Sequence, residues 1–248
     1  MLMVVAPLEQ ELAGLRRALR SRTLTMEPAD GIVQPMALHA VGLGRQAGER
    51  VQSLLSARRD RLEGLLLLGF AGAMAPTLAT GDVVLAQRYY QGSSQVFIEA
   101  DSGLCRRAAA AASETGLPIR ELDSLTLDHL VSTPQEKQAL VQRYPAGTVN
   151  MEDYWVASAA RDAGVPFLAV RSVLDKSTQR LPSYLLELPP SRAGAALTLA
   201  SRPWRVLPAL VLARQSAVAS AALARFALAF SRERSKVEHG PTLGSLRR

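Results

Sequence analysis

Short apolar runs alternate with amphipathic stretches along the first three quarters of the chain. The runs at residues 1–6, 65–68 and 167–173 have the length and the β-branched, apolar composition of buried strands. Residues 8–20 carry leucine at every third or fourth position, and a proline precedes them, as at the start of many helices. Strands therefore alternate with helices from the beginning of the chain.

The same pattern continues as far as residue 175. We expect a loop or edge hairpin at residues 21–34. We expect strands at residues 35–41 and 124–130 and after the polar turn at residues 76–82. We expect helices at residues 47–58, 101–116 and 134–144. Because strands and helices alternate, we expect an α/β fold around a mostly parallel or mixed sheet.

Two carboxylates follow apolar segments in the second half of the chain. One short segment ends at Met151, and we expect a helix from Glu152 to the glycine and proline at residues 164–166. The strand at residues 167–173 then leads to Asp175. In an open parallel sheet both carboxylates project from the carboxyl edge, where small ligands bind. Glu11 lies just beyond the first strand and has two interpretations, a partner on this edge or a carboxylate that suits a helix dipole.

Glycine-rich segments follow two of the strands. Residues 42–47, Gly-Leu-Gly-Arg-Gln-Ala, match the G-x-G-x-x-[GA] pattern of dinucleotide sites between a strand and a helix. The pattern is short, and its physical content is an anion site of backbone amides beside Arg45, for which phosphate is the better candidate. Residues 69–73 form a second small-residue segment that lets a ligand lie directly against the backbone.

Length and composition indicate one large domain in a reducing compartment. The 248 residues include one cysteine, Cys105, which excludes an intrachain disulfide and a cysteine metal cage. We see no secretory signal and expect no run long and uncharged enough to cross a bilayer, so we expect a cytoplasmic protein.

The net charge is concentrated near the C-terminus. Nine basic and two acidic residues lie from residue 202 onward, so this segment carries the whole net charge of +7. Residues 203–230 are also apolar and alanine-rich, which fits either core helices or a surface that rests on a membrane or covers an apolar substrate. Trp204 lies between two arginines, as in an interfacial anchor, and we expect a flexible tail at residues 232–248.

The motifs at residues 6–11, 41–44, 69–73 with 81–84, 151–152 and 170–175 occur in the order seen in one enzyme superfamily. Over residues 1–178 the chain resembles the nucleoside phosphorylases and methylthioadenosine/S-adenosylhomocysteine nucleosidases. The resemblance implies one domain, residues 1–248, with a three-layer α/β/α fold around a mixed, mostly parallel sheet. The apolar, basic helical segment at residues 179–231 follows this core.

The resemblance also implies the roles of individual residues. Asp175 resembles the acid that shares a proton with N7 of the purine, and Glu11 resembles the residue that positions or deprotonates the attacking water. Glu152 resembles the glutamate that binds the ribose hydroxyls, beside Met151, which packs against the sugar. The other expected site residues are Phe70, Ala71, Gly72 and Val131 for the substrate, and Gly44, Arg45 and Arg171 for phosphate or the nucleophile.

These residue types suit the cleavage of an N-glycosidic bond, which builds positive charge on the ribosyl ring and negative charge on the leaving base. A buried acid neutralises the base, and a carboxylate on the sugar favours the cationic transition state. The resemblance implies no metal and no organic cofactor, with phosphate as a possible co-substrate, and it implies a homo-oligomer without nucleic acid as a partner.

The apolar C-terminal segment departs from enzymes of small nucleosides and is similar to the hopanoid-associated phosphorylases. That resemblance implies adenosylhopane as the substrate, cleaved to adenine in hopanoid biosynthesis, and peripheral contact with the inner membrane. Three alternatives stay open. They are a nucleosidase or phosphorylase of a small soluble nucleoside, a dinucleotide-binding protein that uses residues 42–47, and a non-catalytic module that binds membranes or nucleic acid.

Overall fold

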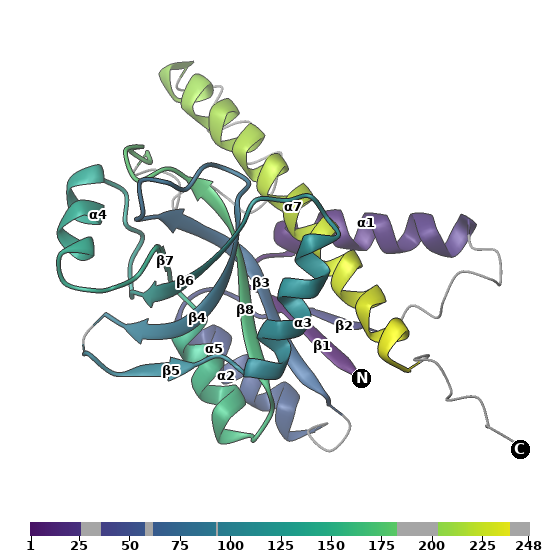
Figure 1. Ribbon diagram of the computed structural model, residues 1–248. Helices are drawn as coiled ribbons and strands as arrows, with labels where there is room; N and C mark the ends of the chain where they lie inside the picture. Colours follow the sequence, from purple (N-terminus) through teal and green to yellow (C-terminus); the bar gives the residue numbers. More distant parts are fainter. Residues whose placement is uncertain (26–35, 58–61, 93, 183–202, 239–248) are drawn as a thin grey trace, which may run out of the picture.

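The computed structural model describes residues 1–25, 36–57, 62–92, 94–182 and 203–238 (Figure 1). In chain order the elements are β1 (Leu2–Ala6), α1 (Glu9–Thr25), β2 (Met36–Ala40), α2 (Arg45–Ser56), β3 (Gly64–Ala73), β4 (Val83–Gln91), β5 (Phe97–Glu99), α3 (Ser102–Ser113), β6 (Ile119–Thr126), α4 (Pro134–Val141), β7 (Thr148–Asn150), α5 (Asp153–Asp162), β8 (Phe167–Asp175), η3 (Pro203–Arg205) and α7 (Val206–Glu238).

Within the described residues, the strands form one mixed sheet of eight strands. Five of the pairings are parallel, namely β1 with β2 and with β3, β3 with β8, β4 with β6, and β6 with β7. Three are antiparallel, namely β3 with β7, β4 with β5, and β4 with β8. Because β8 pairs with both β3 and β4, the strands β3, β7, β6, β4 and β8 close into a ring. The predicted mixed, mostly parallel sheet is confirmed.

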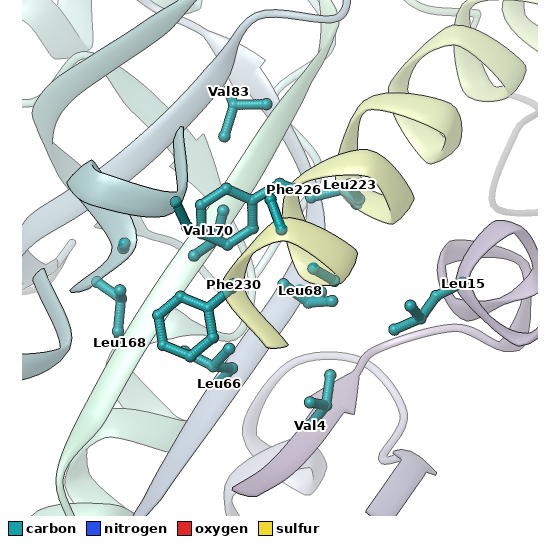
Figure 2. Close-up of a cluster of buried hydrophobic side chains, with 14 of the residues drawn as sticks. Val4, Leu15, Leu66, Leu68, Val83, Leu168, Val170, Leu223, Phe226 and Phe230 are labelled. Atoms are coloured by element: carbon teal, nitrogen blue, oxygen red, sulfur yellow. The ribbon is translucent and has the colours of Figure 1, made fainter. Parts of the chain in front are cut away.

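Helices cover both faces of the sheet, which confirms the three-layer α/β/α fold. On one face, α1, α3 and α7 bury their apolar side chains against alternate residues of β1, β3 and β8. Figure 2 shows Phe226 and Phe230 of α7 lying over Leu66, Leu68 and Val170 of the sheet. On the other face, α2 and α5 pack on the intervening residues of the same strands. Successive side chains of a strand point to opposite faces of the sheet, and both faces are covered by helices, so both sets of side chains are apolar.

Several predicted boundaries are wrong. The strand expected at residues 65–68 is longer, because β3 continues through the small-residue segment to Ala73 and pairs there with β8 and β7. Strand β6 ends at Thr126, so the predicted strand at residues 124–130 is shifted toward the N-terminus. Helix α1 extends to Thr25, where a loop was expected. The short edge strand β5 was missed, because three residues are too few to show a period.

The C-terminal segment is one helix of 33 residues, α7, which continues to Glu238. The helix includes residues 232–238 of the predicted tail, and residues 183–202 and 239–248 of the predicted segments lie outside the described residues. The part of α7 from Ala219 to Ser231 is mostly buried between α1 and α3, whereas its first half extends beyond the sheet (Figure 1).

One helix of the described chain, Val206–Arg232, is long and apolar enough to cross a bilayer by length and composition. The expectation that no run has this property is wrong. Only 17% of the apolar 18-residue window of this helix is buried, although the end of the helix is part of the core. Length and composition alone are weak evidence for a membrane span.

Candidate active site

Glu11 lies in the first turn of α1 and turns back toward the sheet. Its Oε2 accepts a hydrogen bond from the backbone N–H of Leu8 (2.7 Å), and its Oε1 accepts one from the N–H of Phe70 (2.8 Å). Burial raises the pKa of Glu11 to about 7, and the nearby Arg171 guanidinium and the two N–H groups oppose this shift. Glu11 can therefore take up a proton near neutral pH, as a general base must.

Arg171 of β8 joins the residues around Glu11 and is fully buried. Its Nε donates to Asp153 Oδ1 (2.8 Å), its Nη2 to Glu152 Oε2 (3.2 Å) and its Nη1 to the carbonyl of Phe70 (3.1 Å). The guanidinium fits because residue 69 is glycine, and a Cβ there would lie 2.1 Å from Nη1 of Arg171. Arg171 is the counter-ion that makes two buried carboxylates tolerable.

Glu152 lies in the turn between β7 and α5, and Asp153 is the first residue of α5. Both of their backbone N–H groups donate to Asn150 Oδ1, at 2.9 and 2.8 Å, which fixes the turn at the start of the helix. Oε1 of Glu152 accepts a hydrogen bond from the N–H of Gly44 (3.2 Å). Burial raises the pKa of Glu152, and the Arg171 guanidinium opposes that shift. Met151 lies half-buried in the same turn.

The strands reach this site in an unexpected way. We expected Glu152 and Asp175 at the carboxyl ends of parallel strands, but β7 runs antiparallel to β3. Their ends still meet, because Gly72 of β3 pairs with Val149 of β7 on one side and with Asp175 of β8 on the other. The closed ring, rather than an open parallel edge, brings the two carboxylates to one region.

Asp175 is the last residue of β8 and is 2% exposed. Its carboxylate forms a buried ion pair with Nζ of Lys137 from α4. Burial raises the pKa of Asp175, and the Lys137 ammonium opposes that shift. A Cβ on Gly72 would lie 3.4 Å from Oδ1 of Asp175, so the acid lies against β3 where that strand has no side chain.

The predicted substrate-binding residues of β3 contribute mainly backbone. Phe70 gives its N–H to Glu11 and its carbonyl to Arg171, while its side chain packs against the core under α7. Ala71 is 4% exposed and pairs with Val173 of β8. Val131, between β6 and α4, belongs to a small core cluster that also contains Leu125.

The predicted phosphate-binding residues divide between two roles. The N–H of Gly44 donates to Glu152, as described above, and so lies at the site. Arg45 is exposed, and its guanidinium lies 4.0 Å from the centre of the Trp155 ring. Its charge therefore rests on an aromatic face at the rim of the site. Among the described residues, no cluster of three His, Cys, Asp or Glu side chains could hold a metal ion.

The geometry separates two groups of side chains along β3. Glu11 and Arg171 lie beside Gly69, and Asp175 lies beside Gly72. Three residues of a strand span about 10 Å. The candidate base Glu11 and the cation Arg171 therefore lie at one end of the site, and the buried acid Asp175 lies at the other. Glu152, which follows β7, is paired with Arg171 of β8.

Three residues that hold this site together were not predicted from the sequence, namely Asn150, Asp153 and Lys137. Asp153 is fully buried and receives hydrogen bonds from Arg171, from Ser124 (2.6 Å) and from Asn150 (2.8 Å). An asparagine three residues before Asp153, at a strand-to-helix junction, is a capping signal that was available in the sequence. Lys137 was not predicted because a lysine in a short helix at the surface is ordinarily solvated.

Comparison with known proteins gives a consistent result. The family model of the phosphorylase superfamily matches residues 31–184. Aminodeoxyfutalosine nucleosidase of Helicobacter pylori (strain J99) is 25% identical over 134 residues, which are 48% of this chain and 58% of that protein. The 5'-methylthioadenosine/S-adenosylhomocysteine nucleosidase of Maridesulfovibrio salexigens is 25% identical over 179 residues, 64% of this chain and 76% of that protein.

Among solved structures, the 5'-methylthioadenosine/S-adenosylhomocysteine nucleosidase of Helicobacter pylori aligns with a TM-score of 0.68. The alignment covers 92% of this chain and 96% of the other at 16% sequence identity, so it supports the fold. The match to the first curated relative spans little more than half of that protein's length.

Proposed function

The chain belongs to the phosphorylase superfamily, and we propose that it cleaves the N-glycosidic bond of an adenine nucleoside. The observation that carries this proposal is the arrangement of Glu11, Arg171 and Glu152 at one end of the site with the buried Asp175 at the other. The relatives support adenine as the base, since those named above are nucleosidases of adenine-containing compounds.

Each side chain has a defined part in this reaction. Glu152 accepts hydrogen bonds from the ribose hydroxyls and, as an anion, favours the positive charge that develops on the sugar. The bond between C1' and N9 breaks with its electron pair going to the purine, and Asp175 gives its proton to N7. A water molecule then forms the new bond to C1' and passes a proton to Glu11. One proton is taken from water and one is given to adenine, so the reaction balances.

Water is the nucleophile that we propose. The pKa of Glu11 near 7 suits a base that works at neutral pH, and two backbone N–H groups hold its carboxylate in one orientation. The competing phosphate site is weaker, because the Gly44 N–H is bound to Glu152 and the Arg45 guanidinium lies on Trp155. Phosphorolysis is the second candidate, because these two residues still border Glu152. Neither route uses a metal or an organic cofactor in this proposal.

For the substrate, we propose an adenine nucleoside with a large apolar 5' substituent, adenosylhopane, reached from the inner membrane. The support is the segment formed by η3 and the first half of α7, where several large apolar side chains of the described residues are exposed. They are Trp204 of η3 (72% exposed), Leu207 (71%), Leu210 (61%) and Val211 (46%) of the helix. Arginines 205 and 214 flank them and suit an anionic lipid surface.

This surface joins the site through the end of β8. Gln215 of α7 exchanges hydrogen bonds with Gln179 (2.7 and 3.0 Å), and Val218 packs against Gly81. Thr80, next in sequence, donates to the carbonyl of Leu174, the residue before the candidate acid (3.1 Å). Gln215 and Val218 therefore link α7, about one to two turns after its exposed apolar residues, to the end of β8, which supports the proposal of a substrate that extends from the site to this surface.

The test of substrate and nucleophile is adenine release from adenosylhopane and from 5'-methylthioadenosine, each with and without phosphate. The proposal expects release from adenosylhopane without phosphate. Release from methylthioadenosine alone would contradict the lipid-linked substrate and favour a soluble nucleosidase. A requirement for phosphate would replace water by phosphate as the nucleophile.

The test of the membrane surface is co-sedimentation with vesicles that contain anionic lipid. We expect Leu207→Glu to weaken binding, and Ala221→Glu is the matched control, because it places the same charge at an exposed position of the packed half of α7. Equal binding by both variants would contradict the proposal that the exposed apolar residues of η3 and α7 bind the membrane. Cytoplasmic localisation and a homo-oligomer also stay predictions, and light scattering of the purified protein measures the latter.

A further inference from the structure

Lys137 is an unusual cation in this chain. Only three of the 29 basic residues are lysines, and Lys137 is 1% exposed. It lies in α4, whose start is fixed by Thr133, since the Thr133 Oγ1 accepts the N–H of Glu136 (3.2 Å). A buried ammonium is costly unless it is paired and hydrogen-bonded, so its position calls for a physical reason.

The partners of Lys137 belong to the candidate active site. Its Nζ forms an ion pair with Oδ2 of Asp175 and donates to the carbonyl of Lys176, the next residue (2.8 Å). Two points of attachment, one to the carboxylate and one to the adjoining backbone, fix the direction of the Asp175 side chain at the end of β8. The cation of α4 thus reaches the acid assigned to the leaving base.

No other charged side chain of the described residues pairs with Asp175. From β3 the acid meets Gly72, which has no side chain. On α4, the neighbouring Glu136 is turned to the exposed His129 (2.7 Å). From the segment after β8, Arg180 reaches Gln135 at the surface (3.5 Å). The charge that bears on Asp175 therefore comes from Lys137.

This pair settles a conflict in the chemistry of the site. A carboxyl group buried without a cation keeps its proton strongly and is a poor donor to N7 of a purine. A cation beside the carboxyl stabilises the carboxylate that remains after the proton has left. With Lys137 beside it, Asp175 is a stronger acid. It therefore loses its proton to the solvent at a lower pH than it would without the cation.

We propose that Lys137 is a positioning residue for Asp175, which orients its carboxyl group and sets the pH range over which it protonates the leaving adenine. This inference rests on the proposed function. In the step itself, the C1'–N9 bond breaks, the proton moves from Asp175 to N7, and the ammonium of Lys137 keeps its own protons beside the new carboxylate.

The test compares the pH profiles of kcat and KM for adenine release by the wild type, Lys137→Met and Lys137→Arg. We expect the alkaline limb of Lys137→Met to move to higher pH by about 1–3 units, the usual effect of one neighbouring charge. We expect kcat below that limb to fall at least tenfold, on the scale of general acid catalysis, with KM little changed. Lys137→Arg keeps the charge and should keep the wild-type limb. Gln138→Met is the matched control, because it adds the same side chain at an exposed position of the same helix.

A profile of folded Lys137→Met with the wild-type limb would overturn the inference and leave Lys137 a structural residue. If Lys137→Met does not fold, carbon and nitrogen NMR of the wild type decides. The inference expects the Lys137 Nζ signal to report the titration of the Asp175 carboxyl, and independent titration overturns it. Absence of adenine release from the wild type would instead contradict the proposed function, and the NMR titration does not depend on that activity.

Discussion

The burial of Glu11 predicts a specific dependence of stability on pH. In the folded protein burial raises the pKa of Glu11 from 4.5 to about 7. The folded state therefore binds a proton between these values that the unfolded state has released, and stability falls as the pH rises through this window. A shift of this size corresponds to about 3 kcal/mol. The effect is present in full below about pH 4.5 and is lost above about pH 7.

Glu11→Gln removes this titration. The substitution also changes the free energy of unfolding by an amount that does not depend on pH. The amide nitrogen of the glutamine faces a backbone N–H whose hydrogen bond the carboxylate of Glu11 accepts. We therefore compare differences. The free energy of unfolding in urea is measured for the wild type and for Glu11→Gln at pH 5 and pH 8, and we expect the wild type to lose about 2.5 kcal/mol relative to the variant, because part of the effect is already lost at pH 5.

Glu9→Gln is the control for this measurement, since Glu9 lies in the same helical turn and is exposed. It should follow the wild-type curve. If the difference between wild type and Glu11→Gln is the same at both pH values, Glu11 is not the buried, proton-holding group described here. Its assignment as the general base would then be lost as well.

Three further substitutions test the site and the core, each by urea unfolding. Gly69→Ala places a Cβ 2.1 Å from Nη1 of Arg171 and should cost about 1–3 kcal/mol and most of the activity, whereas Gly103→Ala should cost little; equal losses would contradict the close contact. Arg171→Met leaves two buried carboxylates without their cation and should cost about 3–5 kcal/mol, less at low pH where they protonate, and a loss independent of pH would contradict the ion pairs. Phe226→Ala empties the core under α7 and should cost about 3–5 kcal/mol, and a loss under 1 kcal/mol would show that α7 is not part of the core.

The periodicity of the sequence was sufficient for the layers of the fold. Strands β1, β3 and β8 are buried on both faces, so they appear as continuous apolar runs, and their helices show one apolar face. The direction of β7 was not predictable in this way. Only three residues long, it could run either way, and its antiparallel pairing with β3 follows from ring closure by β8. Long-range pairing of this kind leaves no local signal in the chain.

The site residues divide along the same line. Glu11, Glu152, Arg171 and Asp175 were found because they follow strands in the order of a known superfamily. Lys137 was not, since its burial depends on where α4 meets the end of β8, a contact between segments 38 residues apart. The exposure of the first half of α7 was also not predictable, because the exposed part and the buried part of this helix have the same apolar composition.

Adenine release by the wild type, Asp175→Asn and Glu11→Gln at pH 7.5 decides whether this site cleaves the glycosidic bond. With adenosylhopane or 5'-methylthioadenosine as the substrate, we expect the wild type to release adenine and Asp175→Asn to be slower by a factor on the order of 10²–10⁴, the scale of general acid catalysis. Glu11→Gln should be comparably impaired. If the wild type releases no adenine from either compound, or if folded Asp175→Asn releases it at the wild-type rate, the site described here does not cleave the glycosidic bond.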